Sequence, residues 1–380
     1  MEKVDHSIHQ SIDRDQLNAI VRRSLRRESF EIQDWQMNQL GGGIGNPVSV
    51  GLYRFQGSGQ EHGEQVNWSV ILKILQSPAN LGLVNMGGSD DQTHWNYWKR
   101  ELLIYQSGLL NSLPDGLVAP RCYEAIELPG NIGMLWLEDI SDSSNGAWSL
   151  ERYALTARHL GRFNGIYSSE ATIPSYPWFG MQRNRNWVNL IDHWKTIPWE
   201  NPRVLQRYPR PEANSFRRML LENERFLATL DLLPKTICHG DTYPTNFISR
   251  RLSDGQEQTV ALDWALMGVE PLGDDLGQLV FGAQMNLKGT AQDEITEVLF
   301  EYYVEGLRDS GCRVDPQQVR FGFTASAALR VGLFQVLQLG EALKHSDMIV
   351  KNYTEHINVS NCFEVTMANE AYTLLSDFSA

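Results

Sequence analysis

The spacing of apolar residues changes in character about 140 residues into the chain. Before that point, short apolar or alternating runs predict strands at residues 35–40, 48–55, 66–75, 121–127 and 132–138. After it, apolar residues recur at helical spacing, which predicts helices over residues 150–167, 186–208, 212–230, 291–308 and 321–345. The pattern therefore predicts an α+β protein with a small sheet-rich lobe, residues 1–137, and a larger helical lobe, residues 138–380.

Three further segments complete this outline. A helix over residues 13–27 is expected behind Asp13, a residue type that caps helices, and a second helix at residues 95–109. Glycine-rich turns are expected at residues 40–47 and 56–65. One short strand region, residues 247–264, interrupts the helical lobe.

Composition narrows the class of protein. The chain has 380 residues and a formal net charge of −13, which is unfavourable for general binding of nucleic acid or anionic membranes. Four scattered cysteines without a CxxC pair predict free thiols in a reducing compartment. No apolar signal core or membrane-length segment is present in the sequence, so we expect a cytoplasmic protein, with its oligomeric state left open.

The densest chemical cluster is Cys238-His239-Gly240-Asp241, followed by Asn246 and, seventeen residues later, Asp263. Phosphoryl transfer needs a carboxylate that orients the acceptor hydroxyl and oxygen ligands for magnesium. Asp241 fits the first role, and Asn246 with Asp263 fits the second. A thiol hydrolase built on Cys238 and His239 is disfavoured, because neighbours in an extended segment point to opposite faces.

A turn signal between these residues suggests how the metal ligands meet. Asp254-Gly255 is typical of a type I′ hairpin turn. Pairing the strands about that dipeptide sets Asn246 directly opposite Asp263, on one face of the hairpin. The sequence therefore predicts a two-ligand magnesium site at the open end of this hairpin.

These motifs resemble a known family. His239-Gly240-Asp241 with Asn246, and Leu262-Asp263-Trp264, are similar to the two signature motifs of the aminoglycoside phosphotransferase and choline kinase superfamily. The resemblance implies a protein-kinase-like fold of two lobes, ATP and Mg²⁺ as cofactors, Asp241 as catalytic base, and Asn246 and Asp263 as metal ligands. It also implies that His239 and Asp275 are structural residues near the site, and it leaves the role of Asp274 less defined.

The resemblance assigns the nucleotide to the first lobe. Lys73 resembles the phosphate-binding lysine, and Glu101 the carboxylate that pairs with it. The remaining ATP-binding positions that it implies are the glycine loop, Gly43, Gly45 and Asn46, and the hinge, Leu137, Glu138 and Ile140. The loop departs from Gly-x-Gly-x-x-Gly, because Asn46 stands at the third glycine position.

The expected activity is transfer of the γ-phosphate of ATP to a hydroxyl of a small molecule. The alternative is a nucleotide-binding pseudokinase or regulatory protein without transfer activity. Its usual mark is loss of the base or of a metal ligand, and both are present here. The choice between ATP and GTP stays open.

The acceptor is expected to bind in the helical lobe, near an insertion at about residues 175–235. Residues 175–211 carry aromatic side chains that either stack on a ligand or pack helices together: Trp178, Phe179, Trp187, Trp194, Trp199 and Tyr208. The same stretch holds six basic residues but only Asp192 and Glu200 as acids, which disfavours a polycationic aminoglycoside. Acid from Glu270, Asp274, Glu341, Glu355 or Glu364 would change that balance. A sugar, nucleoside alcohol, amino alcohol, amino acid alcohol or antibiotic all stay open.

Overall fold

The chain forms two compact units. The computed structural model describes residues 12–41, 48–81, 88–143, 148–169, 171–190, 195–344 and 363–378. The first unit comprises Met1–Gly146, Pro177–Phe179 and Ile248–Leu266, and the second comprises Ala147–Tyr176, Gly180–Phe247 and Met267–Ala380. The boundary expected at residue 137 thus lies inside the first unit, and the chain passes between the units more than once.

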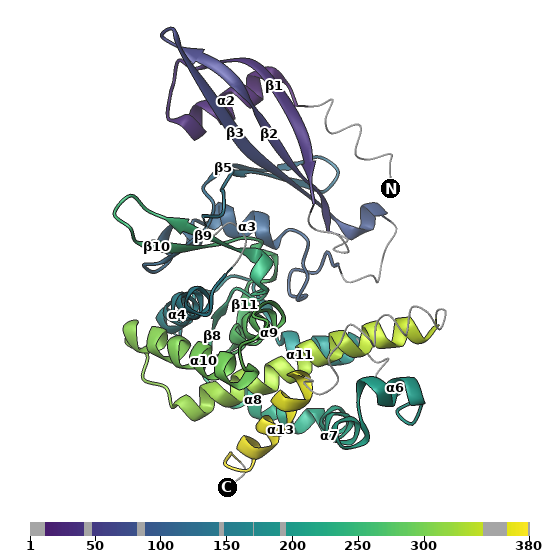
Figure 1. Ribbon diagram of the computed structural model, residues 1–380. Helices are drawn as coiled ribbons and strands as arrows, with labels where there is room; N and C mark the ends of the chain where they lie inside the picture. Colours follow the sequence, from purple (N-terminus) through teal and green to yellow (C-terminus); the bar gives the residue numbers. More distant parts are fainter. Residues whose placement is uncertain are drawn as a thin grey trace. The chain divides into compact units, whose positions relative to one another are not determined.

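The first unit is built on a five-stranded antiparallel sheet in the order β1-β2-β3-β6-β5 (Figure 1). Its strands are β1 Glu31–Leu40, β2 Ser49–Glu61, β3 Glu64–Gln76, β5 Cys122–Leu128 and β6 Ile132–Glu138. The predicted strands are therefore confirmed, but the loop expected at residues 56–65 is wrong. The β2 and β3 strands run on to a tight turn at His62 and Gly63, both with positive φ.

Helices close both faces of this sheet with apolar side chains. Helix α2, Arg14–Leu25, is capped by Asp13, whose Oδ1 accepts a hydrogen bond from Gln16 N at 2.7 Å, as the sequence predicts. It buries Leu17, Ile20 and Val21 against the sheet in a core that includes Trp136. A second core cluster packs α3, Arg100–Ser107, on the sheet through Leu102. Helix α3 is shorter than the predicted segment 95–109.

A second small sheet of the first unit has the order β4-β10-β9, with β4 Leu117–Val118, β9 Phe247–Arg251 and β10 Glu257–Ala261. The type I′ turn expected between β9 and β10 is wrong. Gly255 N donates to Leu252 O and Leu252 N to Gln256 O, which closes a three-residue loop. Gly255 has φ 84°, but Asp254 is not among the described residues with positive φ. This is the turn that ends in a bulge at glycine and shifts the register by one residue.

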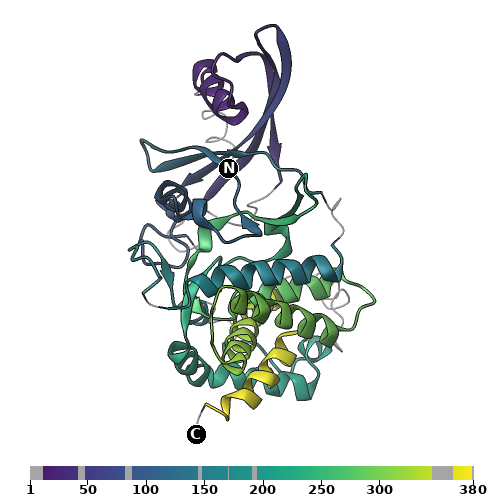
Figure 2. The same cartoon turned by 90° about the vertical axis from the view of Figure 1, so that its left-hand side faces the viewer.

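The second unit is mainly helical (Figure 2). The bounds of its helices are α4 Leu150–Ile166, α5 Arg183–Leu190, α6 Pro202–Arg207, α7 Arg210–Leu221, α8 Asn223–Leu232, α9 Leu276–Asn286, α10 Gln292–Asp309, α11 Pro316–Lys344 and α13 Phe363–Leu375. A three-stranded sheet, β7 Gly180–Met181, β11 Gly268–Pro271 and β8 Lys235–Cys238, lies among them. The α+β class is confirmed. The helix predicted over residues 186–208 is wrong, since α5 and α6 occupy only parts of it.

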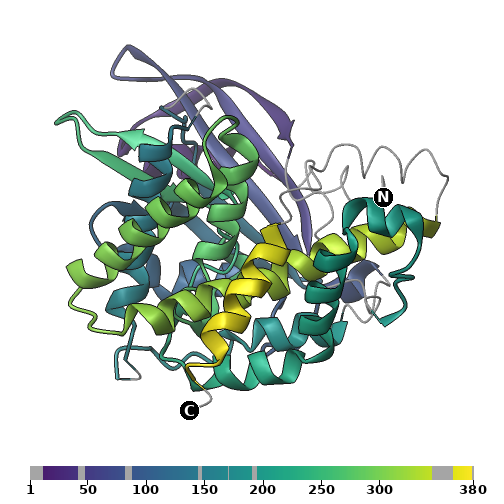
Figure 3. The same ribbon diagram turned by 60° about the horizontal axis from the view of Figure 1, so that its bottom comes forward.

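Close helix packing holds the second unit together. Helices α4 and α10 lie side by side in Figure 2, and a Cβ on Gly161 would approach Tyr303 O to 2.1 Å. Only glycine allows this approach of the two backbones. Helix α13 packs along α11 (Figure 3), which is buried on nearly all sides, as its apolar sequence predicts. No described helix has the combination of length and apolar character that crossing a membrane demands.

Candidate functional site

A buried ion cluster centres on Lys73 in the first unit. Lys73 lies on β3, only 9% exposed, in a run that is otherwise apolar. Its Nζ lies 2.5 Å from Glu101 Oε2 on α3 and 2.9 Å from Asp263 Oδ1, just after β10. Three segments far apart in sequence therefore converge on one ammonium group, as the resemblance implies for Lys73 and Glu101.

The opposite charges in this cluster stabilise the charged form of Lys73. Burial alone would lower the pKa of Lys73, but Asp263 and Glu101 outweigh burial and raise it. Burial raises the pKa of Glu101, a tendency that Lys73 opposes. The lysine therefore stays charged in a place where an unpaired ammonium would be strongly destabilising.

The backbone around Asp263 is held in an unusual conformation. Asp263 has φ 55°, in the left-handed region that few non-glycine residues adopt. Arg100, fully buried at the start of α3, donates to the carbonyl oxygens of Ala265, Trp95 and Trp178 at 3.2, 2.6 and 2.6 Å. Sequence reasoning missed Arg100, although it stands next to Glu101. Strain of this kind is frequent at functional sites.

The hinge expected at the end of β6 is partly committed to other bonds. Glu138 N donates to Arg121 O at 2.8 Å, and the Glu138 side chain accepts from Arg250 at 2.9 Å. Of the predicted hinge residues, Leu137 pairs with Ile71 in the sheet, and Ile140 follows the strand. The Glu138 N–H is therefore not available to donate a hydrogen bond to an adenine ring. Gly43, Gly45 and Asn46 lie outside the described residues.

In the second unit, Asp241 stands on a loop after β8 and before the short 3₁₀ turn η4, Pro244–Asn246. Asn246 Nδ2 donates to both Asp241 O and Asp241 Oδ2 at 2.9 Å, and Gln278 Nε2 donates to Oδ1 at 3.2 Å. The carboxylate is about one third exposed. Asp241 is therefore oriented from both sides and stays accessible to a ligand.

Buried polar groups support this loop from beneath. Asp275 accepts from His239 N at 2.8 Å and Gly240 N at 2.9 Å, while Asn164 on α4 donates to it at 3.0 Å. His239 is fully buried, and its Nδ1 accepts from Asp241 N at 3.2 Å. Asp275 and His239 thus fix the loop backbone, the kind of role that the resemblance implies. Cys238 is buried as well, and burial raises the pKa of its thiol far above the usual range.

The predicted pairing of Asn246 with Asp263 on a strand ladder is wrong. Asn246 lies in η4, before β9 begins, and Asp263 lies beyond the end of β10. Neither residue belongs to the hairpin ladder, and the turn that was to fix their register has a different form. The role of both residues as metal ligands stays a prediction that rests on the resemblance.

Sequence reasoning missed two residues beside Asp241. Gln278 lies on α9 and Arg330 on α11, and the Arg330 Nη2 lies 3.8 Å from Asp241 Oδ1. Gln278 carries no signal in the sequence that sets it apart. Arg330 does, because it interrupts an apolar helical run between Leu329 and Val331.

A second buried charge cluster in the second unit centres on Arg183. Arg183 Nη1 lies 2.8 Å from Asp274 Oδ2, and Arg183 N donates to Glu270 Oε1 at 2.9 Å. All three side chains are at most 3% exposed. Asp274, whose role the sequence left less defined, is thus tied to Arg183. Burial raises the pKa of Glu270 to about 7, although Arg183 opposes this.

This pKa predicts a pH dependence of stability. Between the ordinary value of 4.5 and about 7, folded Glu270 keeps a proton that the unfolded chain releases. Its contribution to the free energy of unfolding therefore falls as pH rises through this window. We expect Glu270→Gln to gain stability relative to the wild type over that range, on the order of 3 kcal/mol. Denaturant titrations from pH 4.5 to 7.5 measure this difference.

The exposed Glu294→Gln on α10 is the matched control, for which the difference should stay flat. A constant difference for Glu270→Gln across the whole range would contradict the prediction.

Four of the aromatic residues of the insertion, Trp178, Phe179, Trp199 and Tyr208, are buried, whereas Trp187 on α5 is half-buried. Trp199, Tyr208 and Phe216 form a buried group with ring centroids 5.9 to 6.5 Å apart. Trp178 and Phe179 are at most 8% exposed and make a T-shaped contact within the first unit. Trp194 lies outside the described residues. These buried rings offer no open face to a sugar or an ammonium group.

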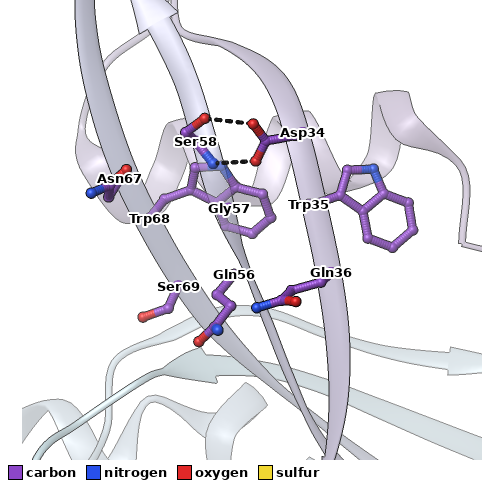
Figure 4. A pocket seen from close by; sticks show the side chains of 9 residues that line it. All are labelled: Asp34, Trp35, Gln36, Gln56, Gly57, Ser58, Asn67, Trp68 and Ser69. Carbon is purple, nitrogen blue, oxygen red and sulfur yellow. Dashed lines mark hydrogen bonds between the residues drawn. The ribbon is translucent and has the colours of Figure 1, made fainter.

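A cavity of about 660 Å³ lies over β1, β2 and β3 (Figure 4). Polar side chains from all three strands line it, and Asp34 accepts hydrogen bonds from both Ser58 N and Ser58 Oγ. None of its lining residues belongs to the cluster around Lys73. It is open to solvent and polar.

Comparison with known proteins shows what the chain is similar to. Residues 156–311 match the sequence model of the Phosphotransferase enzyme family. An amicoumacin kinase solved with AMP-PNP and Ca²⁺ is 13% identical, with 97% of this chain and 96% of that chain covered and a TM-score of 0.50. A choline/ethanolamine kinase family protein from Mesorhizobium loti is 16% identical, with 95% and 97% covered and a TM-score of 0.48. A search of curated proteins gives no significant match.

The fold is therefore that of the protein-kinase-like phosphotransferases. Over residues 156–311, the match to the Phosphotransferase enzyme family bears out the predicted resemblance to the aminoglycoside phosphotransferases. The family match covers most of α4, the loop of Asp241 and the segment of Asp263.

Proposed function

We propose that this protein transfers the γ-phosphate of ATP to a hydroxyl of a small molecule. The observation that carries the proposal is the buried cluster of Lys73 with Glu101 and Asp263. Burying the Lys73 ammonium in a strand is unfavourable unless it has anionic partners. A phosphate forms the same charge-assisted hydrogen bonds as a carboxylate, so this ammonium is suited to bind one. The first unit would then hold the nucleotide, with Ile140 among the groups for adenine.

The second unit would supply the acceptor chemistry. Asp241, oriented by Asn246 and Gln278, would accept a hydrogen bond from the acceptor hydroxyl and take its proton as the phosphoryl group transfers. His239 and Asp275 would keep the loop backbone in place during this step. Because the base is intact and firmly positioned, an active enzyme is favoured over the binding-only alternative.

Asn246 and Asp263 each offer an oxygen atom of the kind that binds magnesium. Asn246 gives its amide hydrogens to Asp241, so its Oδ1 is the atom left to act as a ligand, and Asp263 supplies a carboxylate. Both are hard oxygen donors, which Mg²⁺ prefers, with phosphates and water completing its shell. When bound, the ion would neutralise charge on the nucleotide phosphates. We propose Asn246 and Asp263 as its protein ligands.

Turnover assays test the proposal directly. Purified protein is offered ATP or GTP, with and without Mg²⁺, against a panel of sugars, amino alcohols, hydroxy acids and antibiotics. We expect nucleotide diphosphate and an acceptor phosphoester, identified by ³¹P NMR, only when Mg²⁺ is present. Saturable nucleotide binding without phosphoester from any alcohol would favour the binding-only alternative.

A further inference from the structure

Arg330 is an arginine placed at Asp241 with little else to bind. It lies inside the apolar helix α11, and its side chain is only 9% exposed. Its nearest charged partner, Asp241 Oδ1, is 3.8 Å away, beyond hydrogen-bond range, and no described residue forms a hydrogen bond with its guanidinium. Burying such a group without hydrogen bonds is destabilising, so its position indicates a ligand that completes it.

Three of the five acids that the sequence offered for a cationic acceptor are already bonded to other residues. Glu270 and Asp274 are buried against Arg183. Glu364 on α13 is fully buried and accepts a hydrogen bond from Tyr208 Oη at 2.7 Å. These three carboxylates are therefore not available to bind a polycation.

We propose that the acceptor alcohol carries an anionic group close to the reacting hydroxyl, and that Arg330 binds this group. The inference rests on the proposed function and names its substrate class. A hydroxyl bound to Asp241 lies about 2.7 Å from its carboxylate. An anion on Arg330 is then only a few bonds from that hydroxyl, because the two side chains are 3.8 Å apart. The five N–H donors of a guanidinium suit a carboxylate or a phosphate equally.

An apolar neighbour is available for the carbon skeleton. Phe334, one helical turn beyond Arg330 on α11, is 45% exposed. Residues four apart share one face of a helix, so Phe334 and Arg330 lie on the same side of α11. The site thus combines a base, a cation and an apolar surface on one unit.

Matched pairs of alcohols test the inference. Glycerate is compared with glyceramide, glycerol 3-phosphate with glycerol, and choline serves as the cationic probe. We expect the wild type to prefer the anionic member of one pair, and Arg330→Gln to lower kcat/KM for that member by about 10- to 100-fold. The neutral member should change by less than about threefold, and Arg330→Lys should recover part of the loss. The favoured pair tells carboxylate from phosphate.

Calorimetric binding of the same probes separates the inference from the proposed function. An anion that binds the wild type but not Arg330→Gln, without turnover, upholds the inference and contradicts the proposed function. Turnover of choline in preference to every anion upholds the function and overturns the inference. Equal losses for charged and neutral acceptors also overturn it, because Arg330 would then only position Asp241. Arg320→Gln, on the same helix but paired with Glu297 and Glu370, is the control and should leave the preference unchanged.

Discussion

Replacing Asp241 by asparagine should lower kcat by about 10²- to 10⁴-fold while ATP binds with nearly unchanged affinity. The Asp241 carboxylate is accessible and can both orient a hydroxyl and take its proton, whereas His239 on the same loop is fully buried. An amide keeps the size of the side chain but cannot act as a base at neutral pH. Asn246 and Gln278 each donate a hydrogen bond to one carboxylate oxygen of Asp241. In the asparagine variant one of these oxygens becomes an NH₂ group, which cannot accept that hydrogen bond.

Single-turnover phosphotransfer and calorimetric titration with a non-hydrolysable ATP analogue measure the two effects separately. Asp254→Asn in the β9–β10 turn is the matched control, since Asp254 only accepts a hydrogen bond from Gln256 N, a bond that asparagine can keep. Turnover of Asp241→Asn within a few-fold of the wild type would remove Asp241 from the mechanism.

Local patterns sufficed for the strands of the first unit and for the order of its site residues. Lys73 sits in an apolar strand, and a buried lysine needs a partner, so its pairing with a carboxylate follows from elementary electrostatics. The capped helix α2 was equally accessible, because a cap and an apolar stripe are both local features.

The β9–β10 turn shows where local reasoning fails. Asp254-Gly255 supports two turns that differ by one residue in register, and the dipeptide does not distinguish them. The structure adopts the form in which only Gly255 has positive φ. A shift of one residue in register moves every side chain of a strand to the opposite face. The predicted pairing of Asn246 with Asp263 depended on the register and is therefore wrong.

The supports of Asp241 were out of reach for a different reason. Asn164, Gln278 and Arg330 come from three helices, and each meets the loop only through tertiary packing. Polar residues are common on helices, and the number of residues between these three and Asp241 follows no regular pattern. The sequence therefore does not predict that they lie near Asp241. Only Arg330 could be singled out in the sequence, because it is a charged residue within an apolar helix. That pattern indicates that Arg330 is buried, but it does not identify its partner.

Replacing Lys73 by methionine should abolish productive use of ATP and also destabilise the fold. Glu101 is 1% exposed, and without Lys73 it becomes a buried charge without its cation. Breaking a buried pair in this way costs about 3–5 kcal/mol. Because Lys73 holds down the pKa of Glu101, its loss raises that pKa further, and the deficit in stability should grow as pH rises.

The double variant Lys73→Met/Glu101→Gln separates structure from function. Glutamine removes the unpaired charge, so the free energy of unfolding should recover in part, whereas kcat/KM for ATP should stay at least about 100-fold below the wild type because no cation meets the phosphates. Lys99→Met, which breaks the more exposed pair with Glu127, is the matched control and should affect neither quantity strongly. Denaturant unfolding at several pH values and steady-state kinetics in ATP provide both measurements. If the double variant regains ATP turnover with its stability, Lys73 is a structural lysine and the nucleotide lies elsewhere.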